Sequence, residues 1–117
     1  MTTNSELENA VKIIAEFMGF NWNERTYDGS NTLVKYENGV PKGFSVSTPM
    51  SLNILNSVWN KYFIFTKDWP KKTRKIAIWG TVSGWITSEL YENPLLEIDE
   101  AACIATAKAI ESLKENK

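Results

Sequence analysis

The sequence predicts an α+β domain in which three helices pack on a mainly antiparallel sheet of about four strands, as a layered sandwich. Three segments place apolar residues at helical spacing, and short β-branched and aromatic runs lie between them, separated by turn residues. The expected order along residues 1–117, taken as a single domain, is α-β-β-α-β-β-α. Hydrophobic residues make up 43% of the chain, which is enough to build one core.

The first helix is expected over residues 5–18. Ser5 and Glu8 have the spacing of a capping box, which satisfies backbone N–H groups of the first turn. Gly19 comes where a left-handed C-cap is expected. The apolar residues that recur on one face are Leu7, Ala10, Val11, Ile14, Phe17 and Met18.

Two strands are expected after this helix. Residues 20–24 alternate apolar and polar side chains, and residues 32–36 form a β-branched and aromatic run. The pair Asn38-Gly39 ends the second strand, because both residues readily adopt positive φ. The following segment, 40–47, contains a proline and a glycine and fits either a loop or an edge strand.

The central helix is expected over residues 48–65. Thr48 can cap it, and Pro49 suits the first helical position, where no N–H is needed. Its end is open, because residues 62–65 would also suit a strand. Its apolar face is broader than a coiled-coil seam and favours a sheet as its partner. That face consists of Ile54, Leu55, Val58, Trp59, Tyr62 and Phe65.

The rest of the chain is expected to supply a second strand pair and the last helix. Residues 66–75 are interpreted as a connector. Residues 76–79 and 85–87 are the strongest strand signals, and the glycines between them fit either an antiparallel hairpin or bulges. The last helix begins near Asp99, a good N-cap, and presents a face of small residues. The tryptophans expected to fill the core are Trp22, Trp59, Trp79 and Trp85.

Composition narrows the chemistry that the chain can perform. Histidine is absent and Cys103 is the single cysteine, which excludes the usual zinc and iron sites and any intrachain disulfide. The formal net charge is −1, so no basic field over the whole molecule attracts nucleic acid. Neither a signal peptide nor an apolar run of about 20 residues is recognised. We therefore expect a cytoplasmic protein that uses no metal or cofactor and does not enter a membrane.

No local motif indicates a catalytic residue. Cys103 lacks a histidine base and is interpreted as a structural cysteine. The two glycines at 80 and 84 lack the lysine of a phosphate-binding loop. An enzyme that uses carboxylates brought together by the fold is an open alternative. It requires a deep pocket lined by several of Asp28, Glu89, Glu92 and Asp99.

The most specific binding signal lies in residues 67–75, where five basic residues surround one tryptophan. An exposed Trp69 would anchor a protein partner, because tryptophan is enriched at binding hot spots. The same cations could instead bind nucleic acid or a phosphorylated small ligand, with an affinity that falls steeply with salt. If the segment has no binding function, it is a solvated connector whose lysines protect a sheet edge from mispairing. The candidate binding residues are Lys67, Trp69, Lys71, Lys72, Arg74 and Lys75.

Three stretches of the chain each resemble a packing motif found in one group of small proteins. Residues 15–20, Ala-Glu-Phe-Met-Gly-Phe, are similar to an IAEFMG opening, residues 47–52 to the stretch before a central helix, and residues 100–117 to a final helix. Together they resemble small phage and prophage proteins of the α-β-α sandwich family. The Trp-Asp-Trp of that family's middle motif and the aromatics of its final helix are absent here. The family has no established activity, so the resemblance implies a fold but no functional residue.

Protein binding is therefore the function that the sequence favours. We expect a non-enzymatic accessory protein of phage or mobile-element type that acts on a host or defence protein. Binding of nucleic acid or a phosphorylated ligand at residues 67–75 is the alternative. A homodimer is left open, because exposed aromatic surface and unpaired strand edges are not visible in a sequence.

Overall fold

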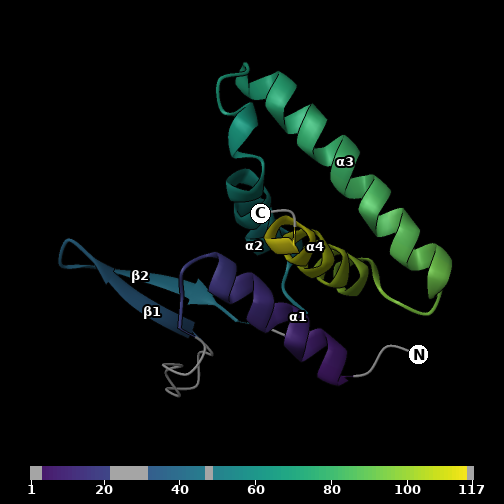
Figure 1. The fold of residues 1–117 in the computed structure, drawn as a ribbon, viewed down its shortest axis with the longest axis horizontal. Helices are drawn as coiled ribbons and strands as arrows, with labels where there is room; N and C mark the ends of the chain where they lie inside the picture. The colour runs from purple at the N-terminus through teal and green to yellow at the C-terminus, as the bar shows by residue number, and fades with distance from the viewer. Residues whose placement is uncertain (1–3, 22–31, 47–48, 116–117) are drawn as a thin grey trace.

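The structure, a computed structural model, describes residues 4–21, 32–46 and 49–115. Within these ranges it holds four α-helices, one short 3₁₀ helix and a two-stranded antiparallel sheet, in the order α1, β1, β2, α2, η2, α3, α4 (Figure 1). The layered α+β sandwich predicted from the sequence is therefore wrong, and so is the sandwich fold that the family resemblance implied. The described chain is mainly helical, and its helices pack on one another instead of covering a sheet.

Helix α1, Asn4–Phe17, confirms the first predicted helix and its predicted end. Gly19 has a φ of 89°, the left-handed conformation expected of a C-cap glycine. Its N–H donates to the Glu16 carbonyl at 3.0 Å, and the Phe20 N–H donates to the Ala15 carbonyl at 3.1 Å. These two bonds form a Schellman motif, which satisfies carbonyls at the helix end and turns Phe20 back into the core.

Strands β1, Thr32–Glu37, and β2, Val40–Ser45, form a hairpin in which Glu37 pairs with Val40. Asn38 and Gly39 have φ of 53° and 80°, as a two-residue type I′ turn requires. The strand predicted over 32–36 is confirmed, and residues 40–45 of the segment 40–47 form a strand. Of the strand predicted over 20–24, Phe20 and Asn21 are not in a strand, and the rest lies outside the described residues. The Phe20 ring stacks on Phe44 at 5.0 Å and so joins the hairpin to α1.

Helix α2, Leu52–Tyr62, is shorter than the helix predicted over 48–65. Ser51 is its N-cap, and the Ile54 N–H donates to the Ser51 hydroxyl at 3.4 Å. Thr48, the predicted cap, lies outside the described residues. After Phe63 the chain tightens into the 3₁₀ helix η2, Ile64–Thr66, which ends the apolar face early. Leu55, Val58 and Trp59 are buried as predicted.

Helix α3, Lys71–Glu92, replaces the hairpin predicted over 76–79 and 85–87, and it also contains the end of the predicted connector 66–75. Its buried residues Ile78, Val82 and Ile86 recur every fourth position, so they form one stripe on a helix, whereas a hairpin would separate them. Burial of this stripe overrides the β-propensity of the short isoleucine and tryptophan runs. Trp79, expected in the core, is 53% exposed because it lies off this stripe.

Helix α4, Ile98–Glu115, is the element against which α1, α2 and α3 pack (Figure 1). It begins one residue before the predicted Asp99. The Glu97 N–H donates to the Glu100 carboxylate at 2.8 Å, which closes the first turn. Small side chains let three helices approach this one closely. The buried residues of α4 are Ala101, Ala102, Cys103, Ala105, Thr106, Ala107 and Ile110.

Candidate binding surface

Large apolar side chains are exposed at the corner where η2 leads into α3. Phe65 is 70% exposed, Ile76 65% and Trp69 46%. Large apolar side chains are exposed elsewhere too, for example Tyr91 and Leu95 near the α3–α4 connection, so exposure alone does not define a site. At the corner the exposed apolar side chains lie beside five cations, and this combination indicates an interaction site. We call this region the corner surface. Its apolar members are Ile64, Phe65, Trp69, Ile76 and Trp79, and its cations are Lys67, Lys71, Lys72, Arg74 and Lys75.

A network of hydrogen bonds fixes the turn that carries Trp69. The buried Thr66 hydroxyl donates to the Phe63 carbonyl at 2.7 Å, and the Trp69 N–H donates to the Thr66 carbonyl at 3.1 Å. Pro70 then occupies the N-cap of α3, and the Arg74 N–H donates to its carbonyl at 2.9 Å. The turn therefore holds the tryptophan at the surface without help from a partner.

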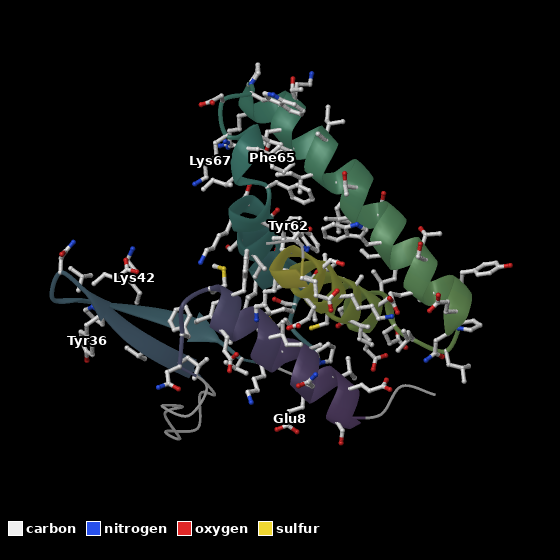
Figure 2. All side chains as sticks on the ribbon, viewed as in Figure 1. Glu8, Tyr36, Lys42, Tyr62, Phe65 and Lys67 are labelled. Atoms are coloured by element: carbon white, nitrogen blue, oxygen red, sulfur yellow. The ribbon has the colours of Figure 1, made fainter. Side chains whose placement is uncertain are left out.

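Ring contacts underneath support the exposed aromatic residues. The buried Phe63 ring stacks on Trp85 at a centroid distance of 5.6 Å, and Phe65 meets Phe63 edge-on at 5.9 Å. Trp79 contacts the buried Trp59 at 6.2 Å. Figure 2 shows Phe65 at the end of the molecule where α2 passes into α3. Phe65 and Trp79 thus each have one edge on the core and the rest of the ring in solvent.

The charge at the corner opposes helix formation. Residues 67–75 hold five basic residues and Asp68, which gives a net charge of +4, and the first turn of α3 holds no acidic residue. Cations at a helix N-terminus are unfavourable, because this end of the helix dipole is already positive. In the described part of the chain, the five cations form no salt bridge. Arg74 is partly buried and donates to the Lys67 carbonyl at 3.4 Å, so it takes part in the turn. The four lysines are exposed, and a negatively charged partner would relieve their repulsion.

The structure brings the six predicted binding residues to this corner. Lys67 and Trp69 lie on the turn, and Lys71, Lys72, Arg74 and Lys75 lie on the first two turns of α3 instead of on a connector. Sequence reasoning missed four members of the surface and placed two of them, Phe65 and Trp79, on buried faces. Trp79 lies off the buried stripe of Ile78, Val82 and Ile86, and this offset was the signal that could have identified it as an exposed residue. The missed members are Ile64, Phe65, Ile76 and Trp79.

A second surface, which we call the acidic groove, lies between α1, α4 and the end of α3. Its volume is about 620 Å³. The Lys108 ammonium donates to the Glu89 carboxylate at 2.7 Å. This bond raises the pKa of Lys108, burial opposes the rise, and the charges of Glu89, Glu92 and Glu6 add to it. The charged residues of the groove, among those described, are Glu6, Glu89, Glu92, Glu111, Glu115 and Lys108.

Of the four carboxylates proposed for catalysis, the structure brings only Glu89 and Glu92 together within the described residues. Glu89 and Glu92 line the acidic groove, whereas Asp99 lines a separate depression beside Ser51, and Asp28 lies outside the described residues. The described residues include no group of three or more His, Cys, Asp or Glu side chains that could hold a metal ion.

Cys103 is fully buried in α4. Burial raises the pKa of its thiol to about 11, a bond with the Met50 backbone lowers it, and the charge of Asp99 adds to the rise. Because the thiolate is the nucleophilic form, this environment is that of a structural cysteine.

Comparison of the chain with protein-family models, curated proteins and solved structures finds no match. The resemblance to phage proteins therefore stays a prediction. Among the helices that the structure describes, none combines the length and the hydrophobicity that a membrane span requires. Function must accordingly be argued from the corner surface and the acidic groove.

Proposed function

We propose that this protein is a non-enzymatic interaction protein whose corner surface binds an acidic, partly apolar segment of a partner protein. The observation that carries the proposal is the exposure of five large apolar side chains among five cations at one corner. Trp69 and Phe65 supply apolar area of the kind that dominates binding energy, and the cations supply attraction to acid groups. The resemblance to phage and prophage proteins supports a host or defence protein as the partner.

The composition of the corner favours a protein over nucleic acid. Aromatic rings can stack on bases, but the aliphatic side chains of Ile64 and Ile76 contribute little to contacts with nucleotides. Against a protein segment they bury apolar area worth about 25 cal/mol per Å². The net charge of −1 also limits long-range attraction of a polyanion. Nucleic acid or a phosphorylated ligand is the second candidate, supported by the cations that form no salt bridge within the described chain.

A pull-down from bacterial lysate at about 0.1 M and about 0.5 M salt tests the proposal. Three proteins are immobilised: the wild type, Trp69→Ala and the control Tyr36→Ala. Tyr36 is 73% exposed on the β-hairpin, far from the corner (Figure 2), so its removal deletes an exposed aromatic ring without touching the proposed surface.

We expect a discrete protein to be retained at both salt concentrations by the wild type and by Tyr36→Ala, and to be lost with Trp69→Ala. Apolar contacts survive salt, whereas contacts that depend on phosphate are weakened by it. Nucleic acid captured only at low salt would replace this proposal with the second candidate. Equal retention by all three proteins would place any binding surface elsewhere.

A further inference from the structure

The corner surface and the acidic groove carry opposite charges of equal size. The described lining of the groove contains five glutamates and one lysine, which gives −4. Residues 67–75 contain five basic residues and one aspartate, which gives +4. Within its own lining, each surface holds a single residue of the opposite charge, Lys108 in the groove and Asp68 at the corner.

The two surfaces lie at opposite ends of α3. This helix has 22 residues and is about 33 Å long, at about 1.5 Å per residue. It begins at the corner and ends beside the groove, near the start of α1 (Figure 1). One copy of the chain cannot join its own two surfaces, but two copies can.

The groove suits a side chain that is apolar along its length and positive at its tip. Apolar residues from α1 and α4, namely Ala10, Ile13, Ile104 and Ala107, contribute to its lining. Carboxylates reach it from α1, α3 and α4. Its volume of about 620 Å³ is that of an ordinary ligand pocket. The lysine side chains of the corner surface have this chemistry.

Part of the negative charge of the groove, at Glu92 and Glu115, is left over after pairing. Glu89 is hydrogen-bonded to Lys108 at 2.7 Å, and Glu111 approaches Lys114 at 3.6 Å in an exposed pair of small energetic weight. Glu92 is exposed at the end of α3, and Glu115 is exposed at the end of α4. The raised pKa of Lys108 is consistent with this excess of negative charge.

We propose that the corner surface of one copy docks into the acidic groove of a second copy, so that the chains associate head to tail. The inference rests on the proposed function and names a second copy of this chain as one partner of the corner surface. Because such a contact leaves one corner and one groove free, further copies can add to it.

Two charge-reversal variants test the inference by analytical ultracentrifugation at about 0.05 M salt, where screening is weak. The corner variant carries Lys71→Glu and Lys72→Glu, and the groove variant carries Glu92→Lys and Glu115→Lys. The helix dipole favours acids at a helix start and bases at a helix end, so all four changes are compatible with helix stability. Circular dichroism of each variant checks that its helices are intact.

We expect the average mass of the wild type to rise with concentration and to return to that of a monomer at about 0.5 M salt. Each variant alone should be a monomer. Their equimolar mixture should form a species of twice the monomer mass, because one variant retains the groove and the other the corner. Growth should stop there, because the substitutions bring the net charge of the remaining corner and of the remaining groove to zero.

A wild type that stays monomeric at low salt up to about 1 mM, near the affinity of the weakest specific complexes, would overturn the inference. Either variant associating alone, or a mixture that forms no dimer, would also overturn it. Retention of a foreign protein that depends on Trp69 would leave the proposed function standing in these cases. Self-association unaffected by the corner variant, together with retention unaffected by Trp69→Ala, would overturn both.

Discussion

At the residue scale, one buried hydrogen bond joins α2 to the centre of the core. The Trp59 indole N–H donates to the Thr106 hydroxyl at 2.9 Å, and that hydroxyl donates to the Ala102 carbonyl at 2.6 Å. Both side chains are buried. An indole N–H removed from water needs an acceptor, and Thr106 supplies it among alanines that cannot.

The substitution Thr106→Val removes this acceptor while nearly preserving side-chain volume. We expect the free energy of unfolding to fall by about 1–3 kcal/mol, because the Trp59 N–H is left buried without a partner. Urea denaturation followed by circular dichroism measures the change. The same substitution at the exposed Thr87, whose hydroxyl bonds one turn back to the Ser83 carbonyl at 2.7 Å, should stay within about 0.5 kcal/mol. Equal effects at the two sites would contradict this role of Thr106.

The thiol of Cys103 gives the protein a dependence on alkaline pH. Its pKa is raised by burial from 9.0 to about 11, so the unfolded chain loses this proton at a lower pH than the folded protein does. The contribution of the protonated thiol to stability is therefore fully present below about pH 9 and is lost as pH rises through about 11.

We expect the loss of unfolding free energy between pH 9 and 11 to be smaller in Cys103→Ala than in the wild type. Comparing the two proteins over the same pH range cancels the titration of lysines and tyrosines. The native thiol should also react with an alkylating reagent at pH 8 far more slowly than the thiol of the urea-unfolded chain. Parallel stability curves and rapid native labelling would contradict the burial of this group.

At the element scale, the sequence allows reliable prediction where the signal is local. The end of α1 follows from Gly19, and the β-hairpin turn follows from Asn38-Gly39, because positive φ is a property of these residues themselves. Helix α3 was mispredicted because its short aromatic and isoleucine runs favour strands in isolation. Its helical state depends on burying Ile78, Val82 and Ile86 on α4, which is a contact between distant parts of the chain.

Two glycines within α3 provide a direct test of its helical state. A Cβ added at Gly80 or Gly84 meets no atom within 4 Å, and neither glycine has positive φ. We expect Gly80→Ala and Gly84→Ala each to raise the free energy of unfolding by about 0.5–1 kcal/mol, because alanine favours helix and glycine does not. Thermal or urea unfolding measures the change.

Gly39→Ala is the matched control for these substitutions. Its added Cβ also meets open space, but its φ is +80°, so the substitution should destabilise the protein by about 1–2 kcal/mol. A hairpin turn at residues 80–84 would instead make Gly80→Ala or Gly84→Ala destabilising, which is the outcome that contradicts helix α3.

At the scale of the whole molecule, the charges of the binding surface were predictable and its shape was not. Five cations in residues 67–75 are visible in the sequence, and the structure gathers them at one corner. The exposure of Phe65 and Trp79 depends on where α2 ends and on which stripe of α3 faces α4. The acidic groove could not be predicted either, because its glutamates come from three helices, one of them at the other end of the described chain.

The central claim is that the corner surface binds a protein through an apolar anchor. The most direct test is the amount of a discrete protein that Trp69→Ala retains from lysate at about 0.5 M salt, relative to Tyr36→Ala. We expect near-complete loss for Trp69→Ala and wild-type retention for Tyr36→Ala, because only the first ring belongs to the corner. Wild-type retention by Trp69→Ala would contradict the claim.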